Sequence, residues 1–156
     1  MTERTSTNER LTLIEQINSA RAAALCPVAP LDDDQERTLG GPSRRLAVYG
    51  SLAPGRSNHH HLADLRGTWT EGWIEGVLHD RGWGAGMGFP GIVLESGGPR
   101  VMVWLLETDD LPRHWARLDA FEGDEYIRLL TLVHKASATP CAANVYALRR
   151  AAFAGP

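Results

Sequence analysis

Short apolar runs separated by turns recur along the chain from residue 45 onward, a pattern typical of β-strands. Glycine, proline and charged residues fill the turns between them. The runs predict strands over Arg45–Tyr49, Gly67–Leu78, Gly91–Leu94, Arg100–Leu106, Ile127–Val133 and Ala142–Leu148. Strands this short, closely connected, favour a small and mostly antiparallel β-barrel.

One segment, Asp109–Phe121, breaks this rhythm and has helical spacing instead. Its apolar residues recur every three or four positions: Leu111, Trp115, Leu118 and Phe121. Asp109 or Asp110 can cap the start of this helix, and Gly123 can end it. We therefore predict an α+β fold in which one internal helix packs against the barrel.

Residues 1–43 have a different pattern from the rest of the chain. Leu11, Ile14 and Ile17 keep approximate helical spacing after a polar start, and the prolines at 27 and 30 end that helix. The stretch from 31 to 43 is expected to be a polar, turn-rich connector. We predict an N-terminal helical extension with a linker over 1–43 and a barrel domain over 44–156. The extension can cap the barrel, mediate a homo-oligomer contact, or be partly mobile.

Composition and charge exclude several classes of function. The chain has 156 residues, a net charge of −3 and a single lysine, Lys135, and its arginines are scattered, so no nucleic-acid partner is expected. It lacks an apolar run near the ~18 residues of a membrane span. The polar N-terminus is not a secretory signal, which predicts a cytoplasmic protein. Cys26 and Cys141 are far apart and are expected to be reduced thiols.

The first strand breaks sharply into a glycine turn, Gly50-Ser51-Leu52-Ala53-Pro54-Gly55. Such a turn can present several backbone N–H groups to an anion. It does not contain the Gly-Lys-Ser/Thr ending of a phosphate-binding Walker loop, nor the G-x-S-x-G of a hydrolase elbow. From these residues, a carboxylate-binding turn and a plain strand-to-loop turn both stay open.

Two further patterns match known motifs by letter only. GMGFPG, residues 86–91, has the dinucleotide-binding spacing, but a strand rather than a helix follows it. We expect a loop there that lines a pocket with Trp83 and Phe89. Neighbouring His59, His60 and His61 cannot converge on one ion, so no metal is expected, and His59 with Asn58 is expected to brace the glycine turn.

The last motif is LDAFEGDEYIR, Leu118–Arg128. Leu118 and Phe121 would face the core, and Glu122 falls at the helix end before Gly123. A carboxylate partly removed from water there has a raised pKa and suits general acid–base chemistry. The alternative from these residues is an ordinary acidic helix end.

Taken in order, these pieces resemble the gamma-glutamylcyclotransferase-like family over about residues 45–148. They are VYGSLAPG with NHH after it, W-x-x-G-x-I-x-G-x-L at 69–78, FPG at 89–91, and LDAFEGDEYIR with a strand ending in VYAL. Members of the family have a small β-barrel with a cavity at its mouth. Its cyclotransferases need no cofactor or metal and release a γ-glutamyl group as 5-oxoproline, which frees an amine or amino acid.

The resemblance implies roles for particular residues of this chain. Glu122 would be the acid–base residue. The residues implied in substrate binding are Tyr49, Gly50, Ser51, Leu52 and Tyr126, while Arg128 matches the family pattern and would help to shape the pocket. The bulky run Val101–Leu105 stands where members commonly have a glycine, and it is expected to narrow or reshape the cavity. Two alternatives stay open: hydrolysis of a related amide or lactam, and a non-catalytic module that binds a small carboxylate.

Overall fold

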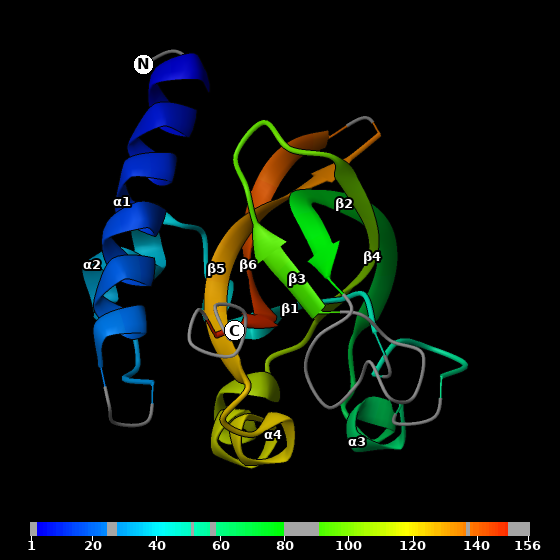
Figure 1. Cartoon of the computed structure of the whole chain (residues 1–156). Helices are drawn as coiled ribbons and strands as arrows, with labels where there is room; N and C mark the ends of the chain where they lie inside the picture. The colour runs from blue at the N-terminus through cyan, green and yellow to red at the C-terminus, as the bar shows by residue number, and fades with distance from the viewer. Residues whose placement is uncertain are drawn as a thin grey trace, which may run out of the picture.

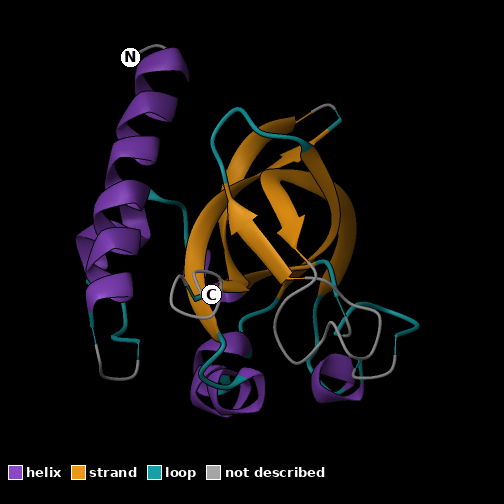
Figure 2. Ribbon diagram, viewed as in Figure 1, coloured by secondary structure: helices purple, strands orange, loops and turns teal. Residues whose placement is uncertain are grey.

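The computed structural model describes residues 3–24, 28–50, 52–56, 59–79, 91–136 and 138–149. Within them, five strands close into a mixed barrel and a sixth strand, β3, lengthens one wall (Figures 1 and 2). The strands are β1 (Arg45–Val48), β2 (Thr68–His79), β3 (Gly91–Leu94), β4 (Arg100–Glu107), β5 (Tyr126–Lys135) and β6 (Ala138–Leu148). The predicted α+β fold is confirmed, and the predicted strands differ from these mainly at their ends.

The barrel closes because the strand order β3-β2-β4-β1-β6-β5 returns to β2, where Trp73 pairs with His134. Every pairing is antiparallel except that of β1 with β6. Closure needs a close approach of the backbone at Gly72, since a Cβ there would lie 2.6 Å from the carbonyl oxygen of His134. Glycine removes that clash.

The interior of the barrel is apolar because alternate side chains of each strand point inward. On β4, for example, Val101, Val103 and Leu105 are buried, whereas Met102 is 64% exposed. The inward-facing residues form one cluster that includes Ile74, Ile92, Val133, Ala143 and Val145.

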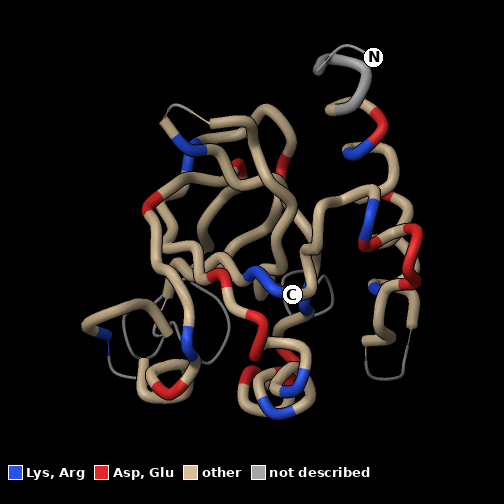
Figure 3. The backbone as a smooth tube through the Cα atoms, turned by 180° about the vertical axis from the view of Figure 1, so that it is seen from behind, with Lys and Arg blue, Asp and Glu red and all other residues tan. Residues whose placement is uncertain are grey.

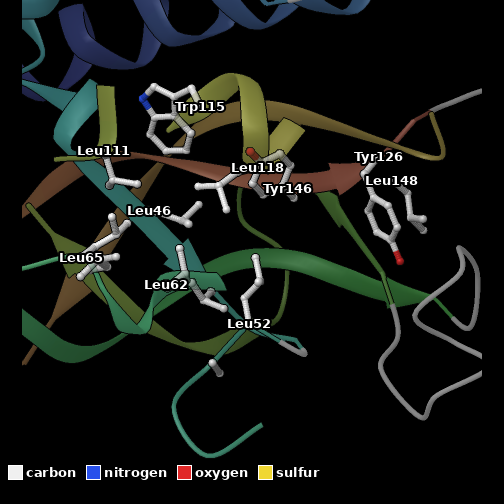
Figure 4. Packing of buried hydrophobic residues seen from close by; sticks show 13 residues of the cluster. Leu46, Leu52, Leu62, Leu65, Leu111, Trp115, Leu118, Tyr126, Tyr146 and Leu148 are labelled. Carbon is white, nitrogen blue, oxygen red and sulfur yellow. The ribbon is translucent and has the colours of Figure 1, made fainter. Parts of the chain in front are cut away.

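A second cluster lies outside the barrel wall, beneath two short helices, α3 (His60–Ala63) and α4 (Trp115–Glu122). Figure 4 shows Leu118 of α4 beside Tyr146 of β6, with Leu62 of α3 on the other side of Leu46. The predicted helix start at Asp109 or Asp110 is wrong. A 3₁₀ turn occupies 111–113, and α4 begins after it with His114 at its N-cap position and no side-chain cap. Asp110 precedes the 3₁₀ turn instead, and its carboxylate accepts from the Arg66 amide.

The N-terminal helix α1 (Glu3–Ala23) lies alongside β5 and forms the third cluster there (Figure 1). Ile14 and Ile17 of α1 pack against Leu130 and Leu132 of β5. The expected turn-rich connector contains a helix, α2 (Asp33–Thr38), that the sequence analysis missed. The sequence signal for α2 is a capping box, in which the side chains of Asp32 and Gln35 cap each other's backbone amides. No residue of α2 is buried, so no apolar spacing marked the helix.

Basic and acidic positions lie next to each other on α1 and α2 and around α4 (Figure 3). Two of the ion pairs, Arg37 with Asp34 and Arg44 with Asp109, join largely exposed side chains and contribute little to stability. In the described part of the chain, no helix is long and apolar enough to cross a membrane.

Candidate active site

Glu122 is the last residue of α4, and Gly123 ends the helix with a positive φ of 81° that favours glycine. The Gly123 amide donates to the Asp119 carbonyl at 3.1 Å. Glu122 is half-buried and thus partly out of water. Burial, with a smaller contribution from the Asp119 carboxylate, raises the pKa of Glu122 to about 7.

Asp119, one helical turn before Glu122, is held by two partners. Arg128 donates from Nε to Oδ1 at 2.9 Å and from Nη2 to Oδ2 at 3.3 Å. The Tyr146 hydroxyl donates to Oδ1 at 2.6 Å. Burial, and then Asp119, raises the pKa of Tyr146 well above its usual value, so this hydroxyl stays protonated. Asp119 is therefore an acceptor fixed in place.

Arg128 is almost fully buried, with 6% of its side chain exposed. Its guanidinium carbon lies 4.2 Å from the centre of the Trp115 ring, and Nη1 donates to Asn144 Oδ1 at 3.0 Å. These contacts, together with Asp119, stabilise a buried cation that would otherwise be costly.

Tyr49, which precedes the predicted turn after β1, lies close to Glu122. The Tyr49 hydroxyl donates to the Tyr146 carbonyl at 2.7 Å and accepts from the Ile92 amide at 2.9 Å, so it joins three strands. Burial raises the pKa of Tyr49 most, and Tyr126 and Glu122 raise it further. The structure thus brings Tyr49, Tyr126 and Glu122 into one neighbourhood.

The turn itself is closed by the Ala53 amide, which donates to the Gly50 carbonyl at 3.1 Å. His59 Nδ1 lies 3.0 Å from the Leu52 carbonyl, which confirms that His59 braces the turn. The predicted residues Ser51 and Asn58 lie outside the described residues, as does the loop 80–90 with Trp83 and Phe89.

The two bulky residues of the run Val101–Leu105 lie in different surroundings, and a reshaping of the cavity by Trp104 stays a prediction. Met102 points to solvent at 64% exposure and narrows nothing, and Trp104 packs on the outer cluster beneath the helices. In the ranges that the structure describes, no three His, Cys, Asp or Glu side chains are grouped to hold a metal ion.

Sequence reasoning missed the roles of Asp119, Tyr146 and Asn144. One signal was available: Arg128 is the only charged residue in the mostly apolar stretch Tyr126–Val133, and a buried arginine requires an acidic or polar partner. The register of β5 and β6, which sets Arg128 opposite Tyr146, supplies the rest and is not readable from the sequence.

The family model of gamma-glutamyl cyclotransferase, AIG2-like, matches residues 46–155, and the chain belongs to this family. Its fold is similar to that of an AIG2-like protein from Mus musculus, with a TM-score of 0.55 and 21% identity over 72% of this chain and 84% of that one. It is also similar to YkqA from Bacillus subtilis, with a TM-score of 0.52 and 24% identity over 67% of this chain. The match spans 35% of the YkqA chain. No curated protein matches the sequence.

Proposed function

We propose that the protein is a γ-glutamyl cyclotransferase with Glu122 as its general acid–base residue. The α-amino nitrogen of a γ-glutamyl amide attacks the γ-carbonyl carbon and forms the lactam C–N bond of 5-oxoproline. The original amide C–N bond breaks, and the amine or amino acid leaves. Glu122 takes the proton from the attacking nitrogen and returns it to the leaving one, so no water is consumed.

The observation that carries this proposal is the half-buried position of Glu122 at the end of α4, near Asp119, Tyr49 and Tyr146, with its pKa raised to about 7. Near neutral pH such a carboxyl exists in both forms, so it can accept and donate a proton within one cycle. The usual pKa of a glutamate is 4.5, so an ordinary exposed glutamate is a poor proton donor at that pH.

Asp119 is unsuited to the same role although it lies one turn away. Both of its oxygens accept from Arg128, and Oδ1 also accepts from Tyr146. Both oxygens of this carboxylate are thus already engaged by the protein, and its orientation is fixed. We infer that Asp119 supplies fixed negative charge, which helps to keep the proton affinity of Glu122 high.

The substrate carboxylate would bind the backbone amides of Gly50, Ser51 and Leu52. The hydroxyl of Tyr49 has a donor and an acceptor partner within the protein, so we assign it to shaping the site. Tyr126, 7% exposed, would form part of the apolar wall. A turn that folds the glutamyl chain toward its own amino group would gain the large effective molarity of an intramolecular reaction.

The test is product analysis with a panel of γ-glutamyl dipeptides and γ-glutamyl amines, in which 5-oxoproline and glutamate are quantified separately. The wild type should release 5-oxoproline. Glu122→Gln should lower the rate by ~10²–10⁴-fold and still bind substrate. Glu125→Gln, which removes an exposed carboxylate nearby, is the matched control and should keep full activity.

Two results would overturn the proposal. Release of glutamate in place of 5-oxoproline would favour hydrolysis of the amide. Binding of a γ-glutamyl compound without any turnover across the panel would favour a module that binds a small carboxylate on the same fold.

A further inference from the structure

The N-terminal helix α1 lies before the residues that the family model matches, yet polar contacts attach it to the barrel. The Asn18 amide group donates to the Leu130 carbonyl and accepts from the Leu130 amide, both at 2.8 Å. The Asn18 side chain thus satisfies both backbone groups of Leu130, as the backbone of a neighbouring strand would. Nearer the start of α1, Arg10 Nη1 donates to the Pro140 carbonyl. Helix α1 is therefore docked in a defined position.

Arg21, in the last turn of α1, reaches further into the structure and is 8% exposed. Its Nη1 donates to the Arg128 carbonyl and to Asn144 Oδ1, each at 3.0 Å. Arg128 donates to the same Asn144 oxygen at 3.0 Å. The Asn144 amide is fixed from the other side, because Nδ2 donates to the Pro42 carbonyl at 2.9 Å. Two buried arginines therefore share one acceptor.

These residues lie at the boundary between the part of the barrel that α1 covers and the part that α4 covers. On the outer face of β5 and β6, Leu130 and Ala142 are covered by α1, whereas Tyr126 and Tyr146 belong to the cluster beneath α4. Arg128 lies between the two regions along β5. The chain of contacts runs from Arg21 through Asn144 and Arg128 to Asp119, which faces Glu122.

We propose that Arg21 is a positioning residue for the reaction: it holds Arg128 against Asp119 and adds a buried positive charge that balances the two carboxylates of the site. This inference rests on the proposed role of Glu122. A buried cation is costly and needs compensation. Burial, and then Arg128, lowers the pKa of Arg21 to about 10, which still leaves it charged at neutral pH, and Asp119 acts in the opposite direction.

The ionisable groups near Glu122 include Asp119 on α4, Tyr49 after β1 and Tyr146 on β6. Tyr126 on β5 lies near Tyr49, Arg128 on β5 pairs with Asp119, and His61 on α3 contacts the ring of Phe121, the residue before Glu122. The phenols of Tyr49 and Tyr146 stay neutral, since burial raises the pKa of each. Burial, and then His60 and Arg117, lowers the pKa of His61, which favours its neutral form. Arg128 and Arg21 are thus the cations that can balance Asp119 from within the buried network.

The test is Arg21→Gln, which removes the charge and keeps a hydrogen-bond donor, with Arg21→Met as a second charge-removing variant. Arg21→Lys keeps the charge. Arg10→Gln is the matched control, because it removes another arginine-to-carbonyl contact of α1 at a site remote from Asp119. The titration of Glu122 is followed by carbon NMR of its carboxyl group, without any substrate.

Arg21→Gln and Arg21→Met should raise the Glu122 midpoint by about half a pH unit or more, since less positive charge faces the two carboxylates. For kcat/KM this predicts a loss of about threefold or more at pH 6 and little loss at pH 9. Arg21→Lys should restore the wild-type midpoint, and Arg10→Gln should not change it.

An unchanged or lowered midpoint in both charge-removing variants would overturn the inference. The same holds for an activity loss of equal size at both pH values, or for equal effects of Arg21→Gln and Arg10→Gln, because each of these indicates only helix docking. A wild type that releases no 5-oxoproline would contradict the proposed function. The role of Arg21 is still tested in that case, because the NMR titration of Glu122 needs no turnover.

Discussion

Replacing Glu122 with glutamine is expected to stabilise the protein at alkaline pH while it removes activity. The folded pKa of Glu122 is about 7 against a usual value of 4.5. The folded state therefore holds a proton that the unfolded state has lost between these two pH values. Its contribution to stability is fully present below pH 4.5 and is lost as pH rises through 7. Glutamine has the same shape and no proton to lose.

The magnitude follows from the shift of 2.5 pH units between 4.5 and about 7. At 1.36 kcal/mol for each unit, ionisation of the folded carboxyl costs about 3 kcal/mol. Most of this falls between pH 5 and pH 8. Relative to the wild type, Glu122→Gln should thus gain about 2 kcal/mol or more in unfolding free energy over that interval.

The assay is urea denaturation of both proteins at pH 5, 6, 7 and 8, followed by tryptophan fluorescence and analysed by linear extrapolation. Glu125→Gln, an exposed position in the same segment, is the control and should follow the wild type at every pH. A constant difference between Glu122→Gln and the wild type across this range would refute the reasoning, because it would mean that Glu122 does not titrate near pH 7 in the folded protein.

Three other substitutions test the surroundings of the site by the same denaturation assay. Tyr146→Phe removes a hydrogen bond to the charged Asp119 and should cost about 1.5–3 kcal/mol; no loss would mean that the hydroxyl is dispensable. Arg128→Met leaves a partly buried carboxylate without its cation and should cost about 3–5 kcal/mol, whereas a gain would contradict the assigned ion pair. Gly72→Ala forces a Cβ to within 2.6 Å of the His134 carbonyl and should cost about 1–3 kcal/mol; a neutral effect would argue against closure of the barrel there.

Much of the fold could be predicted because the signals are local. Apolar runs and turn residues identified all six strands, and the spacing from Leu111 to Phe121 identified the helix that ends in Glu122. The start of that helix was mispredicted since two acidic residues offered plausible caps, and a tertiary contact between Asp110 and the Arg66 amide decided otherwise. Helix α2 was missed because its evidence is a polar capping pair and not an apolar stripe.

Some residues of the candidate site could likewise be predicted from local motifs, and others could not. Glu122 was recognisable from its place before Gly123, and Tyr49 and Tyr126 from the motifs around them. The partners of Arg128 were not recognisable, because they depend on strand register and on the docking of α1. Asn144 and Arg21 are 123 residues apart in sequence, and the hydrogen bond between them exists only in the folded protein.

The most direct test of the central claim is the pH dependence of kcat/KM for 5-oxoproline release by the wild type. If Glu122 accepts the proton, kcat/KM should fall about tenfold for each pH unit below a midpoint of about 7. In Glu122→Gln, this fall of kcat/KM at low pH should disappear, together with most of the rate. A wild-type rate that stays constant down to pH 5, or a Glu122→Gln variant that keeps this fall and the rate, would contradict the account.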